Sequence, residues 1–318
     1  MTIAPLTDPV QPSPADDAPL PDAIRRIGAL MRGWSLEATR PSESEIASLQ
    51  AIVAPGTQIY LPAVPTRDPM AHIDAAIRLH AAGFVPVPHV AVRNFATTAL
   101  LDRFLARMTG EAGVRRVLVI GGDRDHPAGP FRDAVEAIDS GVLQRHGIGE
   151  IGIAGYPQGH PRLSEQELDR ALKDKIDIAA EIGISVHIVT QFCFAAEPII
   201  AWIGRLRDFG IEHPVRIGLV GPTNLATLLR YARRCGVRAS AQGLARQSGL
   251  AKHFFGMSAP DGLVRALADA RAGGHLGKVA LHFFSFGGIV ATARWAKAVA
   301  DGRITPDAAG SFQVAPPL

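Results

Sequence analysis

The chain has 318 residues, of which 47% are hydrophobic and 20% are charged, and its formal net charge at pH 7 is +3. This hydrophobic fraction can supply a sizeable core and excludes a chain that is disordered throughout. An excess of three positive charges is too small for the basic surface of a nucleic-acid-binding protein. The two cysteines, Cys193 and Cys235, exclude a disulfide framework and favour a reduced, cytoplasmic compartment.

The first 20 residues contain five prolines and three aspartates but no lysine, arginine or apolar run. A secretory signal needs a basic start and a continuous apolar segment, so we expect residues 1–20 to be a flexible tail. No window approaches the roughly 18 uninterrupted apolar residues of a membrane span. Residues 21–310 show no linker and are predicted to form one catalytic domain.

Eight short, nearly continuous apolar runs are predicted to be strands covered by helices. In chain order they are Trp34–Glu37, Gln58–Pro62, Val85–Val92, Arg116–Gly121, Ile151–Tyr156, Val186–Gln191, Val215–Val220 and Val279–Phe284.

The stretches between these runs carry helix signals. Asp68 before Pro69 is typical of a helix start, and Gly83 of its end. Ser164 and Glu167 fit a capping box at the start of another helix. A third helix is predicted from Thr223 to Cys235, with Gly236 ending it.

Eight strand–helix units over about 280 residues predict an α/β fold, a single-domain (β/α)8 TIM barrel. A doubly wound sheet is the alternative, but it would normally have a glycine-rich nucleotide turn after the first strand. The G-x-G-x-x-G pattern at residues 147–152 precedes a predicted strand instead of following one. We therefore interpret it as a helix-to-strand connection without phosphate-binding function.

In a TIM barrel the reacting groups lie at the carboxyl ends of the strands. Several of these ends carry polar side chains, and their convergence at one barrel mouth favours a functional site. The strand-end candidates are Glu37, His89, Gly122, Asp123, Tyr156, His160 and Gln191. Taken singly, His89 suits a core histidine and Lys175 a solvated helix face. We found no zinc, haem, P-loop or nucleophile-elbow motif, and we interpret Cys193 as a small core residue.

Several segments resemble the 5,10-methylenetetrahydrofolate reductase family. Residues 153–161, with Tyr156-Pro157 and His160-Pro161, resemble its A-x-Y-P-E-x-H-P segment, and residues 190–194 resemble its T-Q-F/L-F-F motif. Weaker similarities lie at Ser35–Glu37 (S-F-E), Pro88-His89 (P-H), Gly122-Asp123 (R-G-D), Leu172–Lys175 (L-K-x-K) and His282–Ser285 (H-F-Y-T). The order is preserved across residues 34–286.

The resemblance implies a flavoprotein oxidoreductase of one-carbon metabolism that interconverts 5,10-methylenetetrahydrofolate and 5-methyltetrahydrofolate by hydride transfer through FAD, as in methionine biosynthesis. It implies that Glu37 is the general acid and that Asp123 tunes the flavin and the pterin. The implied cofactor-binding residues are His89, Gly122, Asp123, Tyr156, His160 and Lys175. The implied substrate-binding residues are Gln191, Glu37 and Phe284.

The sequence departs from the family pattern mainly on the flavin side. Gly121 replaces the arginine of R-G-D, although Arg124 could substitute for it. The segment Tyr60-Leu61-Pro62 lacks a hydroxyl that the family pattern places near the flavin. At the eighth strand, Phe284 replaces the tyrosine of the family pattern. We hypothesise that the folate chemistry is retained while the electron donor or the physiological direction differs from NADH-driven reduction.

Two alternatives stay open: a flavin-free member that transfers hydride directly from NADH, and a non-catalytic folate-binding subunit. A homo-oligomer is expected, whereas nucleic-acid, membrane and metal partners are not.

Overall fold

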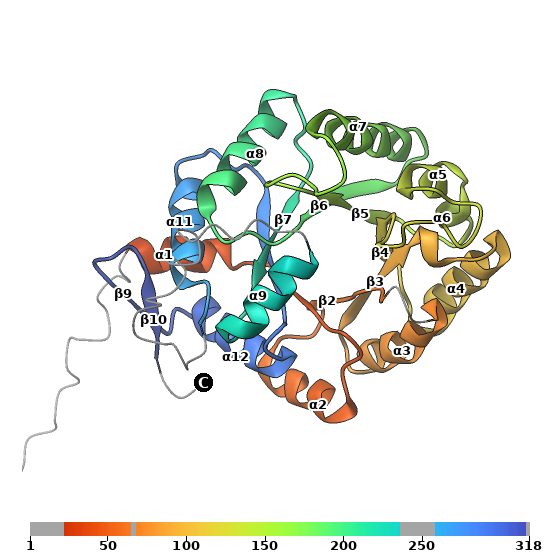
Figure 1. The fold of residues 1–318 in the computed structure, drawn as a ribbon. Coiled ribbons are helices and arrows are strands. Elements are labelled where there is room, and N and C mark those ends of the chain that lie inside the picture. Colours follow the sequence, from red (N-terminus) through yellow and green to blue (C-terminus); the bar gives the residue numbers. More distant parts are fainter. Residues whose placement is uncertain (1–21, 65–67, 236–257, 316–318) are drawn as a thin grey trace, which may run out of the picture.

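A computed structural model describes residues 22–64, 68–235 and 258–315. Eight parallel strands close into a barrel in the order β1 to β8, and helices surround it (Figure 1). The strands are β1 (Ser35–Glu37), β2 (Gln58–Leu61), β3 (Val85–Ala91), β4 (Arg116–Ile120), β5 (Glu150–Gly155), β6 (Ser185–Thr190), β7 (Val215–Val220) and β8 (Val279–Phe284). The predicted TIM barrel is therefore confirmed and the doubly wound sheet is wrong, because β8 pairs with β1.

Most of the helices join successive strands and pack their apolar faces against the outside of the barrel, whereas α1 precedes β1 and α12 follows β8. The helices are α1 (Asp22–Leu30), α2 (Glu43–Ile52), α3 (Ile73–Ala81), α4 (Thr98–Glu111), α5 (Ala134–Asp139), α6 (Val142–Arg145), α7 (Glu165–Glu181), α8 (Ala196–Asp208), α9 (Leu225–Arg234), α11 (Asp261–Ala272) and α12 (Ile289–Ala300), with the 3-10 turns η2 (Pro69–His72) and η3 (Val92–Asn94). The main core lies between strands and helices, where Trp202 and Trp295 are buried. No helix in the described ranges is long and apolar enough to cross a membrane.

The helix ends follow the local signals, with two corrections. Ser164 and Glu167 form the predicted capping box of α7, and Asp68 accepts a hydrogen bond from the Met70 N–H. That start forms the short turn η2, with Pro69 at its first position, and α3 begins after it at Ile73. The helix predicted from Thr223 begins later, at Leu225, because the Asn224 side chain caps it. The expected end at Gly236 lies outside the described residues.

The segment with the G-x-G-x-x-G pattern connects α6 to β5, as the sequence predicted. Gly147 has a φ of +67°, and its N–H donates to the carbonyl of Gln144, which ends the helix. The chain then enters β5 at Glu150. A dinucleotide turn would follow a strand and open a helix, so this geometry is that of a helix-ending turn.

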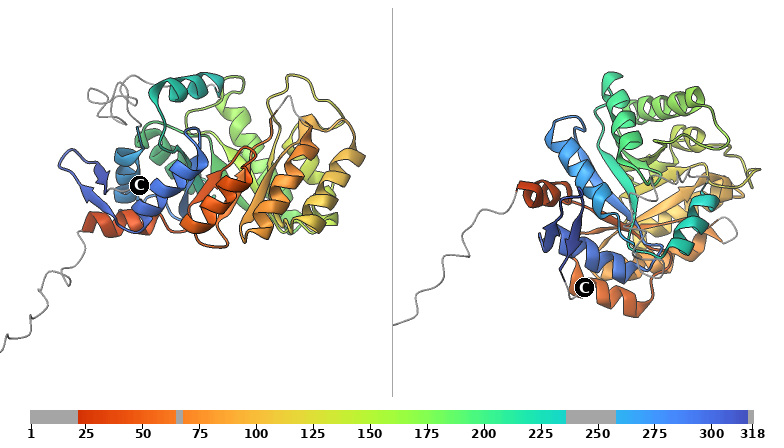
Figure 2. Two further views of the ribbon diagram at one scale, coloured as in Figure 1. Left: turned by 90° about the horizontal axis from the view of Figure 1, so that it is seen from below. Right: turned by 60° about the vertical axis from the view of Figure 1, so that its left-hand side comes forward.

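A short antiparallel hairpin, which was not predicted from the sequence, follows α12. It consists of β9 (Ile304–Pro306) and β10 (Phe312–Val314) and contacts α11 and α1. Figure 2 shows α1, in dark red, at the end of the barrel opposite to α9, in teal. Because α9 follows the carboxyl end of β7, it lies on the side where a TIM barrel places its site.

Candidate active site

Glu37 and His89 meet inside the mouth of the barrel. Glu37 is the last residue of β1 and His89 lies near the end of β3, so both strands bring a polar side chain to the same end. The Oε1 atom of Glu37 lies 3.4 Å from Nε2 of His89, and each side chain is only 10% exposed. The structure thus joins two of the residues that the sequence singled out.

Burial makes this pair electrically neutral near pH 7. It raises the pKa of Glu37 from 4.5 to about 8, because removal from water penalises the carboxylate form. Burial, with a smaller contribution from His72, lowers the pKa of His89 from 6.5 to about 3. The two groups therefore form a polar contact and not an ion pair, and Glu37 carries a proton that it can give up.

A second group gathers at the ends of β4 and β5. Tyr156 and His160 pack edge to face, with ring centroids 5.1 Å apart. Burial raises the pKa of Tyr156 and lowers that of His160, and the nearby Asp123 carboxylate raises both. Gln191 and His160 line the same small hollow, and the Oε1 atom of Gln191 accepts a hydrogen bond from the Phe192 N–H. Asp123 itself is exposed.

Gly122 allows the chain to turn directly after β4. Its φ is +94°, and a Cβ at this position would lie 3.1 Å from the Cβ of Ala91 on β3. Both the backbone angle and the close approach favour glycine. The turn sets the start of the loop that carries Asp123.

Lys175 lies on α7 and is buried, so its interpretation as a solvated helix face is wrong. Lys175 is 8% exposed, and its helix packs against α5, a contact that periodicity on α7 alone does not reveal. Burial lowers the pKa of Lys175 to about 8, and the carboxylates of Asp133 and Asp174 oppose this effect. Within the described ranges no hydrogen bond to its ammonium was found, which leaves three donors for a ligand.

Aromatic rings cluster where β6, β8 and α9 meet. Phe284 packs against Phe192 and Phe286 with ring centroids 5.3 and 5.6 Å apart. Tyr231 of α9 stacks on Phe286 at 3.8 Å with nearly parallel planes. Such rings offer flat apolar faces to a planar ligand. Cys193 is buried, and burial raises the pKa of its thiol to about 12, consistent with a core residue.

The inside of the barrel holds a polar network that was not predicted from the sequence. The Tyr60 hydroxyl lies 2.8 Å from Nε2 of His187, and Nδ1 of His187 lies 2.7 Å from Glu150. Glu150 also pairs with Arg116. The hydroxyl of Tyr60 is therefore engaged inside the barrel. Alternation places these side chains inward on β2, β5 and β6, but barrel interiors are usually filled by branched aliphatic residues.

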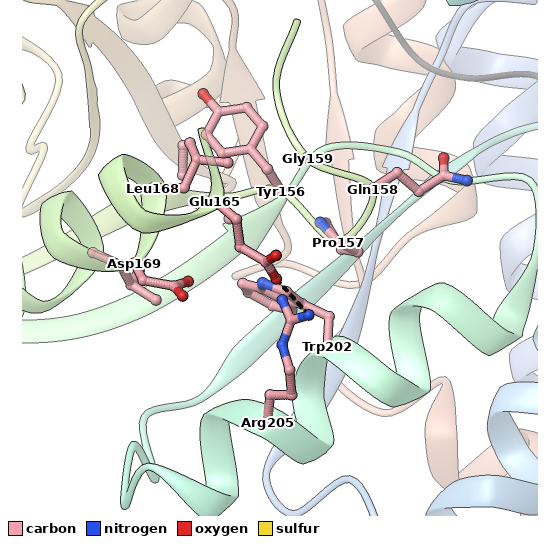
Figure 3. Close-up of a pocket in the computed structure, with 12 residues that line it drawn as sticks. Tyr156, Pro157, Gln158, Gly159, Glu165, Leu168, Asp169, Trp202 and Arg205 are labelled. Atoms are coloured by element: carbon pink, nitrogen blue, oxygen red, sulfur yellow. Dashed lines mark ion pairs between the residues drawn. The ribbon is translucent and has the colours of Figure 1, made fainter. Parts of the chain in front are cut away.

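A cavity of about 290 Å³ lies outside the barrel, between the end of β5 and helices α7 and α8 (Figure 3). Trp202 lines it, and Glu165 and Arg205 point toward each other across it with an ion-pair distance of 2.6 Å. Tyr156 is the only predicted site residue in its lining. The cavity therefore adjoins the second group and is separate from Glu37 and His89.

Comparison with known proteins connects this geometry to a family. The sequence profile named Methylenetetrahydrofolate reductase matches residues 66–248, more than half of the chain. The chain belongs to the methylenetetrahydrofolate reductase family. The match includes His89, Asp123, Tyr156, Lys175 and Gln191 but begins after Glu37.

Curated members of this family are similar over part of their length. Methylenetetrahydrofolate reductase 1 of Schizosaccharomyces pombe is 31% identical over 47% of this chain and 25% of its own length. The 5,10-methylenetetrahydrofolate reductase of Pectobacterium carotovorum is 27% identical over 49% of this chain and 50% of its own. The Escherichia coli enzyme is 26% identical over 50% and 51%. The aligned stretch thus spans about half or less of each relative.

A solved structure shares the fold. An uncharacterised protein from Clostridium thermocellum, described as binding two copies of 5-methyl-5,6,7,8-tetrahydrofolic acid, superposes with a TM-score of 0.57. It covers 87% of this chain and 96% of its own, at 10% sequence identity. At this identity the likeness supports the barrel architecture.

Proposed function

We propose that the protein interconverts 5,10-methylenetetrahydrofolate and 5-methyltetrahydrofolate, with Glu37 as the general acid. The observation that carries this proposal is the buried, protonated Glu37 at the barrel mouth of a methylenetetrahydrofolate reductase family member. Protonation of the bridging nitrogen opens the five-membered ring of the methylene substrate and generates an electrophilic iminium. A positioned acid that stays protonated near neutral pH suits this step.

FAD is the cofactor that these residues fit. The buried Lys175 ammonium offers donors to a phosphate, and Tyr156 and His160 lie at the adjoining strand end. Two buried polar atoms, Nε2 of His89 and Oδ1 of Asn94, lack a hydrogen-bond partner within the described part of the chain, and both residues line one hollow. Bound FAD would carry the hydride, and NADH is a candidate electron donor.

Gln191, Asp123 and Phe284 suit the folate side. The Oε1 atom of Gln191 is engaged by the Phe192 N–H, so its NH2 group is left to donate to an acceptor on the pterin. Asp123 is exposed at the mouth, where it can approach the ligand and influence its proton affinity. Phe284 and its aromatic neighbours offer faces for a planar ring.

The absorption spectrum of the purified protein tests the cofactor. We expect the bands of oxidised flavin, and we expect 5-methyltetrahydrofolate to bleach them. Adding NADH in a parallel sample shows whether it is also an electron donor. A colourless protein that converts methylenetetrahydrofolate with NADH would contradict the FAD proposal and support direct hydride transfer. A protein that binds folate without turnover would contradict the enzymatic proposal altogether.

A further inference from the structure

Arg93 holds the loop between β4 and α5 through its backbone and its side chain. Its Nε atom donates to the carbonyl of Arg132 at 2.6 Å, and its Nη1 atom donates to the carbonyl of Arg124 at 3.2 Å. Its backbone N–H donates to Gly121, and its carbonyl accepts from Ala128. One residue of η3 thus makes four hydrogen bonds along residues 121–132.

A glycine lets this loop lie close to the residues that follow Arg93. At Gly121 a Cβ would make only an ordinary van der Waals contact, 3.9 Å from Nε of Arg93. A Cβ on Gly129 would lie 2.3 Å from the carbonyl oxygen of Phe95, a distance that only glycine permits. The loop is therefore packed directly onto residues 93–96. By contrast, Arg124, which the sequence suggested as a replacement for an arginine at position 121, is exposed.

The two ends of the loop lie beside the groups assigned to the cofactor. Asp123, near its start, acts electrostatically on Tyr156 and His160. Asp133, at its end, caps α5 and acts on the buried Lys175. Displacing the loop would therefore change the charge around both groups at once.

We propose that Arg93 is a positioning residue that clamps loop 121–133 and thereby sets Asp123 at the barrel mouth and Asp133 beside Lys175. The proposal rests on the proposed function for its effect on FAD, whereas the clamp itself is independent of it. Arginine suits this task because its planar fork reaches two carbonyls at once, which a lysine ammonium on a flexible stem does not match. Within the described ranges no ion pair of Arg93 was found, so its binding partners are carbonyl dipoles.

The variants Arg93→Met and Arg93→Lys test the clamp, with Arg103→Met as the control because Arg103 is exposed on α4. Hydrogen exchange of the full-length protein reports on the loop directly. We expect both Arg93 variants to speed exchange in residues 121–133 by about tenfold or more, because each lost hydrogen bond to a charged group corresponds to at least about a tenfold change. The control should match the wild type. Unchanged exchange in Arg93→Met, or full restoration by lysine, would overturn the clamp.

FAD binding then tests its consequence. We expect the dissociation constant for FAD to rise by about tenfold in both Arg93 variants. In a plot of FAD affinity against pH, we expect the alkaline limb, where affinity is lost, to move to lower pH. The pH shift follows because Lys175 would lose Asp133, which opposes the effect of burial, while Asp174 on α7 remains. General destabilisation would not move that limb. If hydrogen exchange in the loop is faster but FAD affinity and its pH dependence are unchanged, the positioning role is overturned. Absence of FAD binding in the wild type would instead refute the proposed function and leave the exchange test intact.

Discussion

Replacing Glu37 by glutamine should stabilise the protein at neutral and alkaline pH. Glutamine keeps the shape of the protonated acid but cannot ionise. In the folded protein the pKa of Glu37 is about 8, against 4.5 for the ordinary side chain. When folding raises the pKa of a group, its contribution to stability is fully present below the pKa of the unfolded chain. That contribution is lost as the pH rises through the pKa of the folded protein. The buried acid therefore costs stability above about pH 4.5.

The magnitude follows from the interval between these two values. Each pKa unit corresponds to about 1.36 kcal/mol, so the full penalty is about 5 kcal/mol above pH 8 and about 3 kcal/mol at pH 7. That is a large part of the roughly 5–15 kcal/mol that keeps a domain folded. Wild-type stability relative to Glu37→Gln should fall by about 3–4 kcal/mol between pH 5 and pH 8.

Denaturant unfolding of both proteins across this pH range measures the difference. Glu181→Gln is the matched control, because Glu181 is exposed at the end of α7, and its stability should run parallel to that of the wild type. If the difference between the wild type and Glu37→Gln does not change with pH, Glu37 ionises freely in the folded protein. The argument that Glu37 stays protonated near neutral pH would then be refuted.

Three further predictions concern the barrel interior and the turn after β4. Tyr60→Phe should lower the free energy of unfolding by about 1–3 kcal/mol, because it leaves Nε2 of His187 buried without a partner. Urea titration measures this free energy, and an unchanged value would contradict the network. Gly122→Ala should lower the free energy of unfolding by about 1–3 kcal/mol, since the φ of Gly122 is +94° and the new Cβ would press on Ala91. An unchanged melting temperature would contradict this geometry of the turn. Burial acts to raise the pKa of Glu150, but hydrogen bonds with His187 and Arg116 lower it to about 2. Its contribution is therefore present above pH 4.5 and lost as pH falls toward 2, so Glu150→Gln should flatten the acid limb of the stability profile; an unaltered limb would exclude it.

The barrel could be predicted from the sequence because each unit carries its own local signals. Apolar runs bounded by polar or glycine residues locate the strands to within one residue at either end, and Ser164 with Glu167 marks the start of α7. The gathering of Glu37 and His89 followed from the rule that parallel strands end on one side. These inferences need only local pattern and topology.

Contacts between distant segments could not be predicted in the same way. Tyr60 and His187 are 127 residues apart, and only the closed barrel brings their inward faces together. The pattern of α7 alone predicts that Lys175 is exposed, because it does not show that α5 packs against α7. The four hydrogen bonds of Arg93 depend on the path of an irregular loop, which no periodicity encodes.

The proton donated by Glu37 is the central claim, and rapid-reaction kinetics of Glu37→Gln test it most directly. Protein loaded with FAD, the proposed cofactor, is reduced beforehand and mixed with 5,10-methylenetetrahydrofolate. Reoxidation of the flavin is followed, while folate affinity is measured by titration. We expect folate to bind within a few-fold of the wild type and reoxidation to slow by about 10²–10⁴-fold, the usual contribution of a general acid. Unchanged reoxidation with intact folate binding would show that Glu37 is not the acid.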